Sequence, residues 1–224
     1  MRRTVVDLSH PIHHGMTTYP GLPGPRVSTH VDRDESAGRL AAGVSFHIGR
    51  VDMVANTGTY LDAPFHFHVD GPDVAGLQVD RLVDLACVVF DAGHVRAVEA
   101  SDLPPSAVME GAAVLVRTGW SRHWGTPAYG VDSPFLDRSA VEALVHAGPA
   151  LVGIDALNVD DVDDPSRPAH NLLLGAGIPI VEHLTNLHRL PATGARFTAL
   201  PAPVVGMGTM PVRAVAVVPP LTTP

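Results

Sequence analysis

Side chains that can hydrogen-bond, carry protons or bind metal ions alternate with apolar ones between residues 56 and 70. The even positions hold Asn56, Tyr60, Asp62, His66, His68 and Asp70, and the odd ones hold Leu61, Ala63, Phe65, Phe67 and Val69. In an extended chain successive side chains point to opposite sides, so this pattern predicts one apolar face and one face of reactive groups. Carboxylates and imidazoles at close quarters suit metal binding and proton transfer. We therefore expect a functional site here.

A purely structural interpretation of the same segment stays open. Pro64 argues against a central strand, because proline cannot donate to a sheet ladder. A single histidine is also more often structural than catalytic. The grouping of Asp62, His66 and His68 directly after the NTGT turn is the feature that favours a site.

The elements that position these groups are predicted to be short strands and few helices. A helix is predicted over 139–148, where Ser139 and Glu142 form a capping box and Gly148 ends the helix. Apolar, β-branched runs bounded by Gly, Pro or Asp predict the strands, at 46–54, 86–91, 112–117, 150–155, 178–182 and 212–218.

A second helix is predicted to begin at Pro168, between two of these strands, and to end at Gly175 or Gly177. Strand, helix and strand then form a βαβ unit, so the flanking strands should be parallel and neighbouring. Asp155 and Glu182 would lie at their carboxyl ends, where ligands bind in α/β sheets.

Length and composition indicate one domain, residues 1–224, with an extensive core. Hydrophobic residues make up 46% of the chain and charged ones 17%, which favours a surface partly covered by another subunit. The net charge is −8 and no lysine is present, so neither nucleic acid nor an anionic membrane is an expected partner. No signal peptide or membrane-spanning run is evident, and we expect a cytoplasmic protein. Cys87 is interpreted as core filling.

Familiar catalytic and cation-binding motifs are missing from the sequence. GWSRH is not a GxSxG elbow, VGMGTM is a turn and HExxH is lacking, which argues against serine acyl-enzyme chemistry. The acidic run IDALNVDDVDD lacks the Gly and Glu of an EF-hand loop. A solvated loop is therefore expected for its last four acidic residues, Asp160, Asp161, Asp163 and Asp164.

Six motifs in order resemble the cyclase family, whose best-understood members are metal-dependent bacterial arylformamidases (kynurenine formamidases). They are VDLSHPIHHGMTTYPG, NTGTYLDAPFHF, VLVRTGWSRHWG, LVGIDALNVDD, PAHNLLLGAGIPIVEHLTNL and PVRAVAVV. The resemblance implies an α/β fold of the swivelling β/β/α type with a mixed sheet, a homodimer or larger assembly, and tryptophan catabolism. It also implies hydrolysis of an amide such as N-formylkynurenine by a metal-bound water.

The family motif HxGTHxDxPxHF is only partly present here. Its aspartate and last histidine are Asp62 and His66, so the resemblance implies metal binding by the first and proton transfer by the second. Its two leading histidines are Asn56 and Tyr60 in this chain. An amide oxygen is a weak ligand and a phenol is mostly protonated at neutral pH, so one of the family's two ion sites should be greatly weakened.

The family's remaining ligands, a His and a Glu twelve residues apart, match His170 and Glu182. Together with Asp62 they would hold one divalent ion, with Zn²⁺ or Mn²⁺ expected and Mg²⁺ open. His47 and His68 are candidates for a fourth ligand.

The leading hypothesis is a metal-dependent hydrolase of a small amide, formamide or lactone. His66 and Tyr60 are the expected catalytic residues, with Tyr60 donating to an oxyanion. Tyr19, Trp120 and Asn56 are expected to contact the substrate. Two alternatives stay open: a cyclase or lyase acting on a polyketide-like or enol substrate, and a non-catalytic homologue that binds a small molecule.

Overall fold

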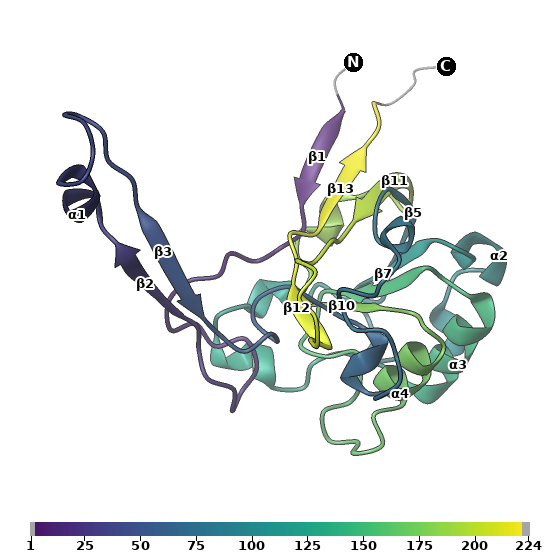
Figure 1. Ribbon diagram of the computed structural model, residues 1–224. Helices are drawn as coiled ribbons and strands as arrows, with labels where there is room; N and C mark the ends of the chain where they lie inside the picture. Colours follow the sequence, from purple (N-terminus) through teal and green to yellow (C-terminus); the bar gives the residue numbers. More distant parts are fainter. Residues whose placement is uncertain (1–2, 221–224) are drawn as a thin grey trace.

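The structure is a computed structural model that describes residues 3–220 (Figure 1). Its centre is a mixed sheet with the strand order β1-β13-β11-β5-β7-β9-β10-β4-β12. The strands of this sheet are β1 (Thr4–Asp7), β4 (Tyr60–Asp62), β5 (Leu85–Asp91), β7 (Ala113–Arg117), β9 (Leu151–Ile154), β10 (Ile180–Glu182), β11 (Thr193–Thr198), β12 (Thr209–Pro211) and β13 (Val215–Val218). The predicted α/β fold with a mixed sheet is confirmed.

The helices are α1 (Arg33–Ala37), α2 (Ser106–Met109), α3 (Arg138–Ala147) and α4 (Pro168–Gly175). The last three lie on one side of the sheet in Figure 1. Two small sheets complete the fold, one of β2 (Arg26–Val31) with β3 (Ile48–Asp52) and one of β6 (Ala97–Val98) with β8 (Phe135–Leu136). No helix in residues 3–220 is both long enough and apolar enough to cross a bilayer.

The alternation of side chains along the central strands produces two cores. In β7, Leu115 belongs to a cluster with Val181 and Leu61 on one face of the sheet. Val114 and Val116 belong to a second cluster, which contains the buried side chains of α3 and α4 on the other face. Each fully buried aliphatic side chain contributes about 1.5–3 kcal/mol, so both faces of the sheet are firmly held. Cys87 lies in the first cluster, as expected.

The predicted βαβ unit is confirmed. β9 and β10 are parallel neighbours joined by α4, with Pro168 in the first turn of the helix. This crossover places the first turn of α4 beside the carboxyl end of β10.

The predicted capping box of α3 is wrong, although the helix and its end at Gly148 are right. The N-cap is Asp137, whose side chain accepts a hydrogen bond from the Ala140 amide. The hydroxyl of Ser139 donates to Asp137 instead of capping the helix itself. Aspartate and serine cap equally well, so the tertiary position of the chain decides between them.

The reactive segment is extended only in part. β4 ends at Asp62, and Pro64–His66 form a 3₁₀ turn, so the predicted alternation of faces is wrong beyond this strand. Phe67 and Val69, expected on an apolar inner face, are exposed. The proline that cannot continue the ladder starts the turn.

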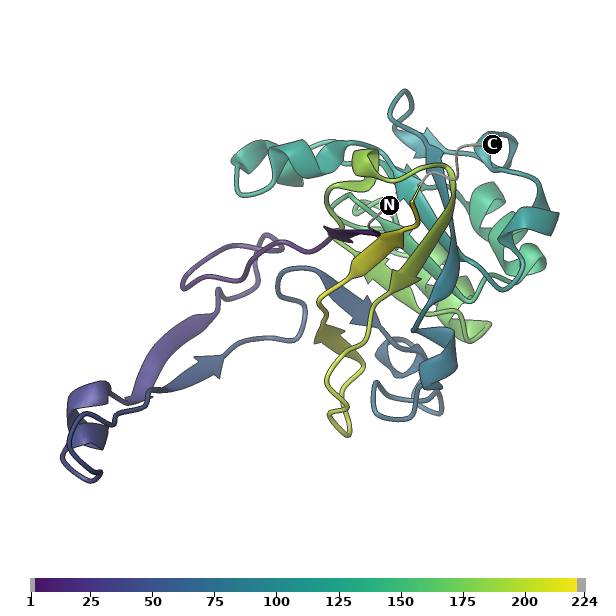
Figure 2. The same cartoon turned by 90° about the horizontal axis from the view of Figure 1, so that it is seen from above.

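Residues 26–52, which we call the arm, extend away from the rest of the molecule (Figures 1 and 2). The predicted strand at 46–54 is β3, and its partner β2 was not predicted. Both strands are exposed along nearly their whole length. The sequence analysis also missed β1, β6, β8, β11 and β12.

Candidate metal centre

The register of three strands brings the acidic residues of the centre to one face of the sheet. In the antiparallel pair of β4 and β10, Tyr60 lies opposite Glu182. On the other side of β4, Thr209 lies opposite Asp62. Residues directly opposite one another share a face, and so do alternate residues of a strand. Tyr60, Asp62 and Glu182 therefore point to the side covered by α4.

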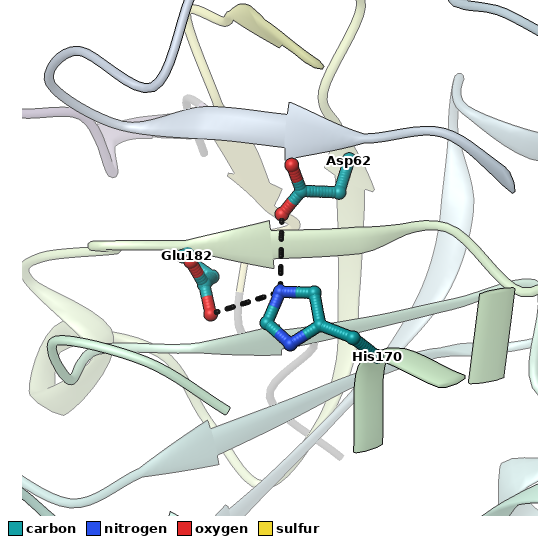
Figure 3. Close-up of side chains that lie close together, drawn as sticks. All are labelled: Asp62, His170 and Glu182. Atoms are coloured by element: carbon teal, nitrogen blue, oxygen red, sulfur yellow. Dashed lines mark ion pairs between the residues drawn. The ribbon is translucent and has the colours of Figure 1, made fainter. Parts of the chain in front are cut away.

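His170 reaches this face from the first turn of α4. Its Nε2 lies 3.8 Å from Asp62 Oδ2 and 3.8 Å from Glu182 Oε1 (Figure 3). One ligand atom from each of the three residues lies within 4.8 Å of the others. Exposure is 0% for Asp62 and Glu182 and 4% for His170. The three predicted metal ligands, which span residues 62–182 of the sequence, thus meet at one buried point.

One oxygen of this cluster has no hydrogen-bond partner among residues 3–220. Asp62 Oδ1 accepts a hydrogen bond from the Thr209 hydroxyl, whereas Asp62 Oδ2 is buried and makes no hydrogen bond. A buried carboxylate oxygen without a partner is costly. A cation between Asp62, His170 and Glu182 would satisfy it, so the residues present fit a divalent ion.

Asp160 orients the histidine of the cluster. Its carboxylate accepts hydrogen bonds from the Ala169 amide at 2.6 Å and the His170 amide at 3.1 Å, at the start of α4. It also accepts one from His170 Nδ1 at 2.6 Å. A metal-binding histidine commonly donates its second nitrogen to a carboxylate in this way. With Nδ1 held by Asp160, Nε2 is directed to Asp62 and Glu182.

The prediction of a solvated Asp160 is therefore wrong, since this side chain is 1% exposed. The Ala169 amide, the His170 amide and the His170 ring N–H at the helix start need acceptors, and Asp160 supplies all three. Its neighbours Asp161, Asp163 and Asp164 are partly or fully exposed, as expected.

The electrostatics of the cluster favour a cation. Burial lowers the pKa of His170, but the hydrogen bond to Asp160 and the charges of Asp62 and Glu182 outweigh it and raise the pKa to about 10. Burial raises the pKa of Glu182 to about 7, with His170 opposing and Asp62 adding to the shift. In the metal-free protein His170 and, in part, Glu182 therefore hold protons at pH 7. A divalent ion would replace them.

His66 lies at the rim of the cluster. Its Nε2 is 3.8 Å from Asp62 Oδ1 and its side chain is 31% exposed. Burial lowers the pKa of His66, Asp62 raises it and His170 lowers it, with a net decrease. A Cβ at Gly208 would come within 2.7 Å of the His66 backbone, so glycine permits this close approach of the chain before β12. His66 is therefore a mostly neutral imidazole within reach of both the cluster and solvent.

A cavity of about 500 Å³ opens onto the cluster. Its lining includes His66, His170, Glu182 and Tyr60 together with Asn56 and Tyr19. Leu22 and Phe67 add apolar surface to the lining, and Arg167 adds a guanidinium group. Phe67 stacks on the His170 ring with centroids 4.9 Å apart.

Three residues from the sequence analysis lie elsewhere. Trp120 is not among the residues lining this cavity; it packs against the second core, and its Nε1 donates to the Tyr129 carbonyl. His68 bonds to the Asn171 carbonyl, and His47 bonds to Thr29 in the arm. Neither of these histidines belongs to the ligand cluster found among residues 3–220.

The sequence analysis missed several side chains around the ligands. They are Thr209, Asp160, His183 and Tyr129. For Asp160 a signal existed, because a metal-binding histidine is expected to have a carboxylate partner and an acidic run precedes its helix. The other three come from strands or loops whose positions in space no local pattern reveals.

Comparison with known proteins identifies the family of this chain. Residues 6–161 match the family model described as "Putative cyclase". The kynurenine formamidase of Bacillus cytotoxicus is 30% identical to this chain over 210 residues, which is 94% of this chain and 95% of the relative.

Two solved structures share the fold over nearly their whole length. A potential metal-dependent hydrolase with cyclase activity superposes with a TM-score of 0.79 at 28% identity, over 96% of this chain and 98% of the other. Isatin hydrolase A from Labrenzia aggregata, bound to benzyl benzoate, superposes with a TM-score of 0.78 at 25% identity, over 96% and 94%. From the family match and the near-complete overlap with its relatives, we conclude that this chain belongs to the family described as "Putative cyclase".

Proposed function

We propose that this protein is a metal-dependent hydrolase that cleaves the amide C–N bond of a small aryl formamide or cyclic aryl amide. The observation that carries the proposal is the buried cluster of Asp62, His170 and Glu182, in which Asp62 Oδ2 lacks a partner and faces the histidine. The names of the relatives, kynurenine formamidase and isatin hydrolase, support this class of reaction.

The ligand set would hold one divalent ion, and we propose Zn²⁺ or Mn²⁺. Two carboxylates with one imidazole suit either ion. When bound, such an ion supplies a Lewis acid that activates water and polarises a carbonyl. Asp62 and Glu182 would balance its charge, and Asp160 would keep the His170 ring in the required orientation.

His66 is proposed to carry the proton. Addition of water to the amide carbon releases a proton, and cleavage of the C–N bond requires one at the leaving nitrogen. A neutral His66 can accept the first proton at Nε2 and return it to the nitrogen. Its partial exposure at the cavity places it between water and a bound substrate.

The cavity walls favour an aromatic substrate. Tyr19, Leu22 and Phe67 supply apolar surface next to the ion site. Asn56 and Arg167 supply polar groups on the same lining. The predicted oxyanion role of Tyr60 stays a prediction. In the structure the Tyr60 hydroxyl donates to Glu182 Oε2 at 2.6 Å.

We also propose that the arm mediates a homodimer. A lone two-stranded hairpin such as that of the arm is only marginally stable in water. On this hairpin Val27 and Val51 form an exposed cross-strand apolar pair. Phe46 and Ile48 are exposed as well. Docking against a second copy would bury them. The cytoplasmic location expected from the sequence likewise stays a prediction.

The function is tested by metal analysis combined with substrate hydrolysis. Protein purified without chelator should contain one Zn²⁺ or Mn²⁺ per chain and should hydrolyse N-formylkynurenine or isatin. Chelation should abolish the activity, and adding the ion back should restore it. Replacing His66 with Gln should lower kcat by about 10²–10⁴-fold while leaving the metal content unchanged. Activity that survives complete removal of the ion would overturn the proposal.

A further inference from the structure

A line of buried hydrogen bonds runs behind Glu182, on the side away from His170. The Tyr60 hydroxyl donates to Glu182 Oε2 at 2.6 Å. His183 Nε2 lies 3.3 Å from the Tyr60 oxygen, and His183 Nδ1 lies 2.8 Å from the Tyr129 hydroxyl. Tyr60, His183 and Tyr129 are each at most 4% exposed. No step of the proposed reaction uses His183 or Tyr129.

The protons in this line can be assigned by counting donors. Tyr60 has one hydroxyl proton, which it gives to the carboxylate, so its oxygen can only accept from His183. His183 must then carry its proton on Nε2. Its Nδ1 is therefore an acceptor and takes the hydroxyl proton of Tyr129. All bonds point the same way, from Tyr129 through His183 and Tyr60 to Glu182.

The surrounding structure holds the imidazole in this line. His183 follows the last residue of β10 with φ of +57°, a conformation that is costly for a residue other than glycine. Trp124 packs edge-on against both the His183 and the Tyr129 rings, at 5.4 and 5.1 Å between centroids. The backbone turn and the indole together fix the ring between the two phenols.

The line determines which oxygen of Glu182 faces the ion site. Oε2 is taken by Tyr60, whereas Oε1 accepts from the Val159 amide and faces His170 Nε2 at 3.8 Å. A carboxylate whose two oxygens have separate partners cannot rotate freely. A second cation at Oε2 would have to displace the Tyr60 hydroxyl that donates to this oxygen.

We propose that Tyr129, His183 and Tyr60 form a positioning chain that holds Glu182 as a one-oxygen ligand and takes the place of a second cation beside it. This inference rests on the proposed function, because it concerns the same ion site. It adds that the centre binds a single ion because Tyr60 donates to Glu182 Oε2. Tyr60 then acts through Glu182 and is a positioning residue.

The first test measures ion affinity in two variants by calorimetric titration of the metal-free protein with Mn²⁺. Tyr60→Phe should weaken the affinity by about 10–100-fold, as the loss of an outer hydrogen-bond partner does. Tyr129→Phe should weaken it less, because two links remain. Thr29→Val, which likewise removes one hydroxyl but lies in the exposed arm, is the control and should leave the Mn²⁺ affinity unchanged. Equal affinity in Tyr60→Phe and the wild type would overturn the positioning role.

A second test needs no metal. The ring nitrogen shifts of His183, read by NMR in the metal-free wild type, should show a proton on Nε2 and none on Nδ1. A proton on Nδ1 would overturn the chain. This separates the two proposals: a wild type that binds neither Mn²⁺ nor Zn²⁺ overturns the function and the positioning role together, while the tautomer still decides whether the chain of hydrogen bonds exists.

A third test removes the chain and restores both family imidazoles. Asn56→His combined with Tyr60→His should raise the Mn²⁺ stoichiometry from one to two per chain, because Glu182 Oε2 is released. Asn56→His alone, which leaves Tyr60 in place, should stay at one. A single ion in a folded double variant would overturn the claim that the chain occupies the place of a second cation.

Discussion

The metal centre and the arm differ in burial: the centre is enclosed by several elements of the chain, whereas the arm is exposed. In the centre, strands β4, β10 and β12 and helix α4 converge, and the three ligands are almost fully buried. Nearly every polar atom there has a partner within the chain. The arm, residues 26–52, has no such interior, and its strands contact mainly each other. Several of its apolar side chains lie on the surface.

The difference follows from the cost of burying polar groups. An unpaired buried donor or acceptor costs about 1–3 kcal/mol, so a buried cluster of charges persists only if other elements satisfy it. The centre therefore depends on contacts within one chain. The arm presents apolar surface that this chain does not cover, so we expect its role to lie in association.

The largest effect is expected from His170→Ala, which removes the ligand between two carboxylates. Asp62 and Glu182 would then repel each other without an imidazole to hold the ion. The ion affinity should fall by more than the roughly 100-fold that loss of an outer partner costs. Titration with Mn²⁺ measures this, and His68→Ala, at a half-buried histidine that bonds to the Asn171 carbonyl, is the control. Comparable losses in both variants would contradict the assignment of the ligands.

A smaller effect is expected from Asp160→Asn. The amide can still accept hydrogen bonds but lacks the charge that orients His170, so the ion affinity should fall about 10–100-fold. Asp161→Asn is a matched control, since its carboxylate is 3.5 Å from Arg96 at the surface and does not contact the histidine. If both variants bind Mn²⁺ like the wild type, Asp160 serves only to cap the helix.

Ion binding should also depend on pH. His170, with its pKa raised to about 10, must lose a proton when the ion binds, so higher pH favours binding. Between about pH 7 and pH 10 the apparent affinity should rise about tenfold per pH unit, for one displaced proton. Below the pKa of Glu182, about 7, a second proton should make the rise steeper. Calorimetry in buffers of different ionisation enthalpy counts the protons released on binding. An affinity that does not change with pH would show that His170 and Glu182 are already deprotonated before the ion binds.

The smallest effect on the centre is expected from a change in the arm. Val51→Glu places a charge in the exposed pair with Val27, so the mass in solution should fall from twice 23.5 kDa to 23.5 kDa. The Mn²⁺ affinity per chain should stay the same, because the centre lies within one chain. Light scattering after gel filtration measures the mass, with Val51→Ala as the milder control. A wild type that is already a monomer would remove the proposed role of the arm.

Local sequence determined the elements that carry the ligands. Pro168 and the strands around it predict the βαβ unit, and this unit requires Glu182 and His170 to lie at one edge of the sheet. Apolar, β-branched runs likewise predict the central strands, with ends that are exact or wrong by at most three residues. Patterns of this kind depend on neighbours in the chain, so they can be interpreted without coordinates.

Tertiary structure decided what surrounds those ligands. Asp160 is buried or solvated depending on where α4 packs, and the loop sequence is compatible with both. The pairing of Tyr60 with Glu182 and of Thr209 with Asp62 follows from strand register, which depends on the whole sheet. The segment after Asp62 turns at Pro64 because β4 ends there, so His66 reaches the cavity while His68 does not line it. Interactions between residues far apart in the chain set these outcomes, and no local period encodes them.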